Sequence, residues 1–469
     1  MSIASSETFD FQRASTEAAG NERLKNAVSS AVMRQYLARQ TRLHDLPDAD
    51  KLRTLAGNIK QHALDHLDYY LEQLGAAVKR NGGHFHLVST ADEARKLILD
   101  IAAKAGCKRI IKSKSMVSEE IELAHEMERL GLDVVETDLG EFIAQIAHER
   151  PSHIVAPIIH KDKASIADLF SQYFKTPYND DPTALTRQAR AHLRDKFRHA
   201  DFGMTGANFL VAETGQVCNV ENEGNARQSI TTPRVLVTLA GIEKVVPRLT
   251  DLAVMLKLLA RSATGQQMTI YTSVFGGPRK AGEKDGPEEF HLVLLDGGRS
   301  EILAGKFRET LRCIRCGACL NACPVYRKIG GHAYGHVYSG PIGALITPLL
   351  NGLETYKDLP NASSLCGACY EACPVKINIP KHLINLRQEI NRRHINNPIE
   401  RMIYRVWAWG LKFPFLYRFI GAIQKWDLRR RAKGSGWVKR LPSVASGWTQ
   451  VRDMPAPAAK SFHEMWRER

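Results

Sequence analysis

Seven of the nine cysteines fall within 61 residues, in two groups whose spacing suits metal binding. The first group reads Cys-x2-Cys-x2-Cys-x3-Cys-Pro, and the second reads Cys-x2-Cys-x3-Cys-Pro. In chain order these residues are Cys313, Cys316, Cys319 and Cys323, then Cys366, Cys369 and Cys373. Short x2 spacings let successive thiolates wrap one cubane cluster, and a cysteine followed by Pro serves the other cluster in bacterial two-cluster ferredoxins. The spacing therefore predicts two iron–sulfur clusters, most simply [4Fe–4S].

On this pattern each cluster takes its ligands from both groups. Cluster one is expected to bind Cys313, Cys316, Cys319 and Cys373, and cluster two is expected to bind Cys323, Cys366 and Cys369. The second group lacks a leading cysteine, and Ser363 stands where that cysteine would be, three residues before Cys366. Cluster two is therefore expected to have three protein thiolates and one iron that is easily lost.

Zinc is the alternative for cysteine pairs at this spacing. A zinc ion needs four ligands, which would leave three of the seven cysteines without a role, and the two Cys-Pro endings have no rationale in a zinc site. Disulfides are not needed in a chain of 469 residues in a reducing compartment. Cys107 and Cys218 stand apart from the groups and are expected to be buried, unused thiols.

The elements before the cysteines alternate between strand and helix patterns. Residues 21–79 have apolar side chains at helical spacing. Strands are predicted at 84–88, 109–112, 133–136, 153–156, 207–213, 234–239, 244–246, 268–273 and 291–295, and helices at 91–104, 118–130 and 165–174. Repeated strand–helix units predict a parallel α/β sheet with helices on both faces.

Composition and patterning divide the chain into four parts. We expect a flexible N-terminus over 1–20, an α/β domain with leading helices over 21–300, a cluster module over 301–395 and a basic C-terminal segment over 396–469. From Arg401 to the end there are 15 basic and 4 acidic residues, and all six tryptophans lie there. This segment is expected to dock onto a partner or an anionic membrane surface; the alternative is that its aromatic residues cover the cluster module.

No signal peptide and no apolar run long enough to span a membrane is visible, so a cytoplasmic protein is expected, with peripheral contact to the inner face of the membrane as an option. The +11 charge of the C-terminal segment also raises nucleic-acid binding as a hypothesis. No known nucleic-acid module accompanies it, so nucleic acid is not the expected partner.

Polar residues at the ends of predicted strands are further candidates. The segment Lys112–Ser115 follows a strand and precedes a helix that we expect Ser118 to cap, so it could bind an anion or form a solvated loop. Glu136, Asp138 and Glu141 could contact a ligand or form an acidic surface. Glu213 could be a nucleophile or a turn residue.

The glycine-rich link between the cysteine groups also contains two histidines. His332 and His336 could ligate metal or carry protons, although no spacing supports either role. The simpler interpretation of residues 324–365 is a tight loop that shields cluster two.

Several motifs together resemble those of the LutB (YkgF) family, the iron–sulfur subunit of the L-lactate utilization system. They are Lys112–Met116, Glu136–Glu141, Pro151–Ile154, Thr205-Gly206, Ala212–Gly215, Glu223–Asn225, Cys313–Pro324, Gly331–Gly335 and Leu365–Pro374. The resemblance implies an α/β LUD domain with the NagB/RpiA/CoA-transferase-like fold, followed by an α-helical two-cluster ferredoxin-like module. The family also has three cysteines in its second group.

The same resemblance implies oxidation of L-lactate to pyruvate together with companion proteins, one a cysteine-rich cluster protein and one a smaller LUD protein. It implies an electron-transfer subunit and leaves open which subunit performs the chemistry. The alternative function is a CoA-transferase-like enzyme that uses Glu213, with clusters in a structural or sensing role.

Overall fold

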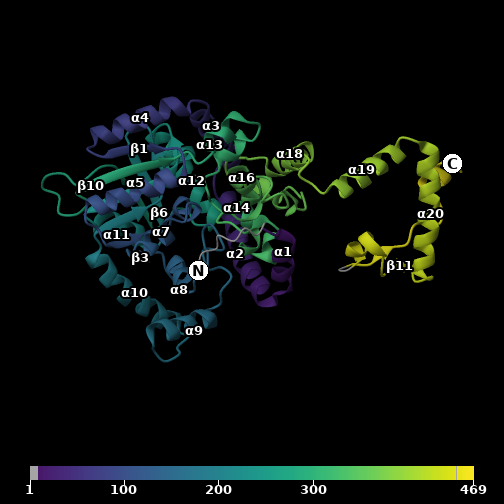
Figure 1. Ribbon diagram of the computed structural model, residues 1–469, viewed down its shortest axis with the longest axis horizontal. Helices are drawn as coiled ribbons and strands as arrows, with labels where there is room; N and C mark the ends of the chain where they lie inside the picture. The colour runs from purple at the N-terminus through teal and green to yellow at the C-terminus, as the bar shows by residue number, and fades with distance from the viewer. Residues whose placement is uncertain (1–8, 450–451, 469) are drawn as a thin grey trace. The chain divides into compact units, whose positions relative to one another are not determined.

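The computed structural model describes residues 9–449 and 452–468 (Figure 1). The chain forms two compact units, the first ending at Arg393 and the second beginning at His394. The first unit contains both the α/β region and the cysteine region.

A six-stranded parallel sheet organises the first unit, with the strand order β1-β10-β7-β4-β2-β3. Its strands are β1 (His84–Val88), β2 (Arg109–Lys112), β3 (Asp133–Glu136), β4 (Phe202–Thr205), β7 (Val235–Gly241) and β10 (Glu289–Leu295). A second sheet has the order β8-β5-β6-β9 and is mostly antiparallel. Its strands are β5 (Phe209–Val211), β6 (Gln216–Glu221), β8 (Val245–Val246) and β9 (Tyr271–Phe275).

The helices of the α/β region connect and cover these strands (Figure 1). They are α4 (Leu67–Arg80), α5 (Ala91–Lys104), α6 (Met116–Glu120), α7 (Leu123–Arg129), α8 (Leu139–Ile146), α9 (Lys163–Phe174), α10 (Pro182–His199), α11 (Asn225–Thr231), α12 (Leu249–Ala263) and α13 (Arg299–Ala304). The 3₁₀ turn η1 (Ile242–Lys244) lies between β7 and β8.

The central strands are largely apolar because both faces of the main sheet are covered. In β10, Phe290, Leu292 and Leu294 pack into one hydrophobic core, whereas Val293 and Leu295 pack into another on the opposite face. Alternate residues of a strand point to opposite faces, so one strand contributes side chains to both cores. This confirms the predicted parallel sheet with helices on both faces.

Several predicted elements are wrong in detail. Residues 153–156 form turns, because the His153 Nδ1 accepts hydrogen bonds from the backbone N–H groups of Val155 and Ala156 and holds the chain bent. The predicted helix over 118–130 is two helices, α6 and α7, separated at Glu122, whose φ is 51°. Strand β4 escaped prediction because Gly203 interrupts it; a Cβ there would lie 2.2 Å from the Ser229 carbonyl oxygen.

The cysteine region is made of short helices and turns. These are η2 (Arg308–Arg312), α14 (Ala318–Ala322), α15 (Tyr326–Ile329), η3 (His332–Tyr334), α16 (Gly340–Asn351), η4 (Leu359–Asn361), α17 (Ala368–Ala372) and α18 (Ile379–Arg392). Such short elements are not stable in isolation and must pack against other elements. Many of these packing contacts come from the helices at the N-terminal end of the chain.

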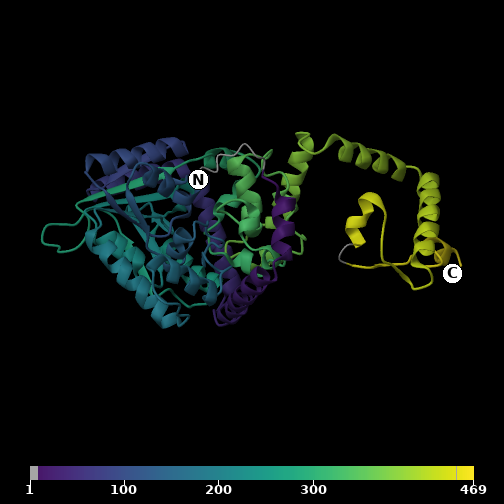
Figure 2. The same ribbon diagram turned by 60° about the horizontal axis from the view of Figure 1, so that its bottom comes forward.

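The N-terminal helices α1 (Phe11–Gly20), α2 (Glu22–His44) and α3 (Ala49–Asp65) pack against the cysteine region (Figures 1 and 2). Helix α2 contacts α14 and α15, and α1 contacts η3. The Arg39 Nη2 donates to the Ala372 carbonyl at 2.8 Å, and the Arg53 Nη2 donates to the Cys373 carbonyl at 2.9 Å. Within the segment expected to be flexible, residues 11–20 are therefore helical and packed, while residues 1–8 lie outside the described residues.

The second unit has a small core formed by Leu428, Ala432 and Val438. Its elements are α19 (Pro398–Leu411), α20 (Pro414–Ala432), β11 (Trp437–Val438), η5 (Ser443–Thr449), β12 (Met454–Pro455) and α21 (Phe462–Arg467). Most of its large apolar side chains are exposed; Trp407 and Trp426 are each 62% accessible. Within the described residues, no helix is both long enough and apolar enough to cross a membrane.

Candidate metal centre and an adjoining cavity

The two cysteine groups form loops with the same backbone conformation. Each loop leads through a left-handed glycine into a five-residue helix, α14 in the first loop and α17 in the second, and ends at a cysteine in extended conformation. Four residues have left-handed φ at equivalent positions: Arg315 (58°) and Gly317 (75°) in the first loop, and Leu365 (54°) and Gly367 (87°) in the second. The sequence repeat is therefore also a structural repeat, and α14 packs against α17.

The first thiol set lines one enclosed cavity. Cys313, Cys316, Cys319 and Cys373 share it with the apolar side chains of Ile154, Ile314, Ile342, Val375, Ile377 and Ile379. Two backbone groups already donate to these sulfurs: the Arg315 N–H to the Cys313 Sγ at 3.4 Å, and the Ile377 N–H to the Cys373 Sγ at 3.3 Å. Four thiols from both loops, with N–H groups directed at the sulfurs, form a donor set that suits an iron–sulfur cluster.

Burial sets the protonation of these thiols. It raises the pKa of Cys316 to about 12 and that of Cys373 to about 11. A bare thiolate is unfavourable in such an apolar site, so these groups lose their protons only when a metal binds them. Metal binding and folding of this region are therefore coupled.

The second thiol set comprises Cys323, Cys366 and Cys369. Burial first, and then the neighbouring Cys323 and Cys366, raise the pKa of Cys369 to about 12. The Tyr326 N–H donates to the Cys323 Sγ at 3.4 Å. Cys366 is exposed, unlike Cys323 and Cys369. This set fits a cluster with three thiolates that lies nearer to solvent than the first.

Ser363 takes the place of a fourth sulfur in the repeat. The Leu365 N–H donates to the Ser363 Oγ at 3.1 Å, as the Arg315 N–H donates to the Cys313 Sγ in the first loop. The hydroxyl therefore occupies the position equivalent to Cys313, although a serine must lose a far less acidic proton than a cysteine to bind iron.

A group of buried cations borders the first thiol set. Arg299 donates to Glu243 at 2.8 Å and to Glu120 at 2.7 Å, and Arg315 donates to Glu243 at 3.3 Å. The charged members are Lys60, Lys244, Arg299 and Arg315 against Glu120 and Glu243. Burial alone would raise the pKa of Glu243, but Arg299, Arg315 and Lys244 lower it to about 2. The group keeps an excess of positive charge next to the cysteines.

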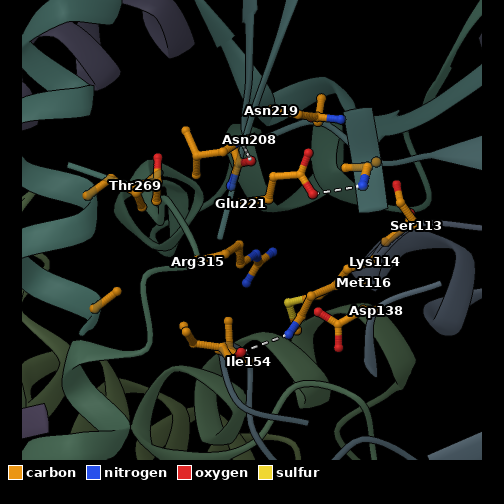
Figure 3. Close-up of a pocket in the computed structure, with 18 of the residues that line it drawn as sticks. Ser113, Lys114, Met116, Asp138, Ile154, Asn208, Asn219, Glu221, Thr269 and Arg315 are labelled. Carbon is orange, nitrogen blue, oxygen red and sulfur yellow. Dashed lines mark hydrogen bonds between the residues drawn. The ribbon is translucent and has the colours of Figure 1, made fainter. Parts of the chain in front are cut away.

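A second cavity, of about 260 Å³, lies between the α/β region and the first cysteine loop (Figure 3). Ser113 and Gly206, which follow β2 and β4, line one part of it, and Asn219 in β6 lines another. Arg315 and Cys316 close it from the cysteine side. The carboxyl ends of parallel strands are where α/β sheets commonly bind ligands.

The two lysines of the candidate segment Lys112–Ser115 have different surroundings. Lys112 is buried and its Nζ lies 2.7 Å from both the Glu119 and Glu136 carboxylates, so it is not part of a solvated loop. Lys114 lines the 260 Å³ cavity and donates to the Val155 carbonyl at 3.1 Å. The cap of α6 is Ser115, not Ser118, and that helix is too short to form an anion site.

The acidic candidates are also divided. Glu136 and Glu141 are buried beside Lys112, whereas Asp138 caps α8 and lines the cavity. An acidic surface is therefore the wrong interpretation. Glu213 is exposed and accepts a hydrogen bond from the Leu249 N–H, and it is not among the residues that line the cavity. This position does not suit the nucleophile of a CoA-transferase.

The remaining candidates lie away from the thiol sets. The His332 Nε2 is 2.6 Å from the Arg150 carbonyl, and His336 is half-buried beside Tyr338. Cys107 and Cys218 are buried, as predicted. No sequence pattern marks Lys244, Arg315 or Tyr338 as a site residue, because the roles of all three depend on contacts between distant segments.

Comparison with known proteins agrees with this architecture. Residues 71–295 match the LUD domain, residues 309–377 match the 4Fe-4S dicluster domain, and residues 388–469 match the C-terminal domain of lactate utilisation protein B. The second match indicates iron–sulfur clusters and confirms the class of cofactor predicted from spacing. The order of an α/β LUD domain followed by a cluster domain is confirmed as well.

Relatives match nearly the full chain. The lactate utilization protein B of Bacillus licheniformis is 46% identical over 466 residues, covering 98% of this chain and 97% of that protein. Those of Bacillus thuringiensis and Bacillus cereus are 44% identical, covering 95% of this chain and 94% of theirs. A solved DUF162 family protein from Deinococcus radiodurans is 14% identical, with a TM-score of 0.29, and the match covers 49% of this chain and 98% of that protein.

Proposed function

The chain belongs to the lactate utilization protein B family, and on that premise we propose that it is the iron–sulfur electron-transfer subunit of a complex that oxidises L-lactate to pyruvate. The observation that carries the proposal is the meeting of seven cysteines in two thiol sets within one dicluster module. Clusters carry single electrons, and the protein sets their position and potential.

We propose two [4Fe–4S] clusters with different ligand sets. Cluster one takes Cys313, Cys316, Cys319 and Cys373, and its support is the shared cavity of these four thiols. Cluster two takes Cys323, Cys366 and Cys369. Its support is the proximity of these thiols, since, in addition to burial, Cys366 raises the pKa of Cys323, and both raise the pKa of Cys369. Cluster one is enclosed beside the cationic group, while cluster two has one exposed ligand, so electrons would pass from the buried site toward the surface.

The partners we propose are a cysteine-rich cluster protein and a smaller LUD protein. Anaerobic co-purification of the chain with proteins encoded beside it tests this directly. We expect L-lactate to bleach the visible absorption of the clusters in the assembled complex. Intact clusters that dithionite reduces but L-lactate does not, with all partners present, would remove the proposed role.

Growth provides a second test of the same role. A strain that lacks this protein and has no other lactate dehydrogenase should fail to grow on L-lactate and should still grow on pyruvate. Complementation with the Cys316→Ala variant should not restore growth, whereas Cys218→Ala should, because Cys218 is a buried thiol outside both sets. Normal growth of the deletion strain on L-lactate would contradict the assignment.

We further propose a cytoplasmic protein whose second unit docks onto a partner or onto the inner face of the membrane. Its support is the combination of Arg429, Arg430 and Arg431 with exposed aromatic residues such as Trp426. Basic residues near an anionic surface contribute roughly 1 kcal/mol each. Flotation with vesicles containing anionic lipid, with and without residues 425–469, tests the membrane alternative. Complex formation by the truncated chain tests docking onto a partner protein. If removing residues 425–469 changes neither vesicle flotation nor complex formation, docking by the second unit is refuted.

A further inference from the structure

The 260 Å³ cavity is lined by buried cations whose hydrogen-bond donors are not all used. The Arg315 side chain is 6% accessible and its guanidinium reaches into the cavity (Figure 3). Its Nη2 donates to Glu243 at 3.3 Å, and its Cζ lies over the Tyr338 ring, 4.3 Å from the ring centroid. Its Nη1 has no hydrogen-bond partner among the described residues. A buried guanidinium with an unused donor is costly, and an anion would satisfy both its N–H and its charge.

Lys244 adds a second cation to the same wall. It is buried and lines the cavity, and no residue in the described part of the chain accepts a hydrogen bond from its ammonium. Burial, and then Arg315, lower the pKa of Lys244 to about 8, which is the direction expected for an ammonium beside a like charge. A negative group between the two side chains would relieve both effects.

The carboxylates of the cavity, in contrast, are already engaged. Asp138 accepts from the Glu141 N–H at 3.1 Å, Glu221 accepts from the Ala226 N–H at 2.8 Å, and Glu223 accepts from the Leu139 N–H at 3.1 Å. Each carboxylate thus stabilises a helix N-terminus, and none of the three forms an ion pair with Arg315 or Lys244. An anion is therefore favoured beside Arg315 and Lys244, not beside these carboxylates.

Size restricts the class of ligand. A volume of 260 Å³ falls below the roughly 300–1,000 Å³ of sites that take drug-sized molecules. It is large enough for a small acid and a few waters at about 30 Å³ each, and it is too small to enclose a nucleotide-sized carrier such as CoA. The amide of Asn219 lines the cavity and offers a hydrogen bond to a hydroxyl or oxo group of such an acid.

The cavity also adjoins the first thiol set. Ile154, Arg315 and Cys316 line both cavities, so a ligand held at Arg315 is separated from the thiol cavity by single side chains. We propose that the 260 Å³ cavity is a binding site for a small monocarboxylate of the 2-hydroxy or 2-oxo acid class, with its carboxylate between Arg315 and Lys244. The choice of acid rests on the proposed function; the requirement for a small anion does not.

Calorimetric titration of the anaerobic, cluster-replete full chain tests the site. The probes are L-lactate, pyruvate, propionate, which lacks the 2-oxygen, and lactamide, which lacks the charge. L-Lactate and pyruvate should bind, propionate should bind more weakly, and lactamide should not bind. The Lys244→Met and Arg315→Gln variants should lose at least tenfold in affinity for L-lactate. The control is Lys257→Met, which removes an exposed charge from α12 and should bind normally.

Iron content and visible absorption are measured for every variant, so that loss of a cluster is not mistaken for loss of the site. Lys244 lies outside the cysteine loops and supplies the decisive variant if Arg315→Gln loses iron. Equal affinity in Lys244→Met and the unmodified chain, or no binding of L-lactate and pyruvate at millimolar concentration, would overturn the site. Binding without lactate-dependent cluster reduction in the complex would instead refute the proposed function and leave the site standing.

Discussion

The loops that begin at Cys313 and at Ser363 share a backbone but differ in their surroundings. An added Cβ at Gly317 in the first loop would lie 3.2 Å from His153, whereas one at Gly367 in the second would meet nothing within 4 Å. Cys316 is buried, and its counterpart Cys366 is exposed. Local sequence thus sets the backbone of each loop, while the rest of the fold determines which thiol set is buried and which one has an exposed member.

The largest difference is expected when equivalent cysteines are removed. Cys316→Ala should lose cluster one and about half of the iron, and it should lower the thermal midpoint strongly, since metal binding is part of the folding free energy of this region. Cys366→Ala should lose cluster two with a smaller drop in midpoint, because its surroundings are already open. Iron analysis and thermal melts under anaerobic conditions measure both. Equal destabilisation by the two variants would contradict the contrast between enclosed and open sites.

Oxidation should separate the two clusters next. Because the proposed cluster two has three thiolates, mild oxidation should remove its unprotected iron first and produce a three-iron EPR signal. Ser363→Cys should suppress this signal by completing the ligand set, and Ser363→Ala should leave it nearly unchanged. If Ser363→Ala instead abolishes cluster two, the serine is a true ligand and the two sites are more alike than proposed.

A smaller effect is expected on reduction potentials. Lys60 is buried and lies within electrostatic reach of Cys313, and its ammonium donates to the Val245 carbonyl at 3.1 Å. Positive charge stabilises the reduced cluster, so Lys60→Met should lower the potential of cluster one by on the order of tens of millivolts and leave cluster two unchanged. Lys51→Met is the control, since Lys51 pairs with Asp48 at the surface of the same helix. A redox titration followed by EPR reads both clusters; equal shifts in both would show that Lys60 does not act locally.

The smallest expected difference concerns the two loop glycines. Both Gly317 and Gly367 have left-handed φ, so alanine at either position should cost roughly 1–2 kcal/mol of backbone strain. Gly317→Ala should cost more than Gly367→Ala, because only its Cβ crowds His153 and Val155. Denaturant unfolding of the two variants with matched iron content gives the comparison. A larger loss of stability in Gly367→Ala than in Gly317→Ala would contradict the claim that the first loop is the more crowded one.

Much of this could be predicted from sequence where the signal is local. Strands β1, β2 and β3 have the predicted bounds, because their apolar runs lie between clear turns. The cysteine spacing likewise predicted the class of cofactor. The helices at the N-terminus were predicted, but not their contact with the cysteine region. Gly57 shows why: a Cβ there would lie 2.9 Å from the Val375 carbonyl oxygen, a neighbour more than 300 residues away that no local pattern encodes.

The cavity residues illustrate the same limit. Nothing near Lys244 in the sequence marks it as part of a site, because it becomes significant only when the turn η1 brings it beside Arg315 of the first cysteine loop. The Glu213 hypothesis failed for a related reason, since the loop that carries it turns outward and caps α12. Ligand residues with a repeated spacing can be recognised in the sequence, whereas residues that only tertiary contacts bring together cannot.

The most direct test of the central claim is the metal content and spectrum of the anaerobically purified chain. Two [4Fe–4S] clusters, one with a labile corner, predict about seven to eight iron atoms per chain and a similar amount of acid-labile sulfide, with a brown absorption that dithionite bleaches. Stoichiometric zinc with negligible iron would contradict the claim, and about four iron atoms in stable, undamaged protein would show that only one of the two thiol sets holds a cluster.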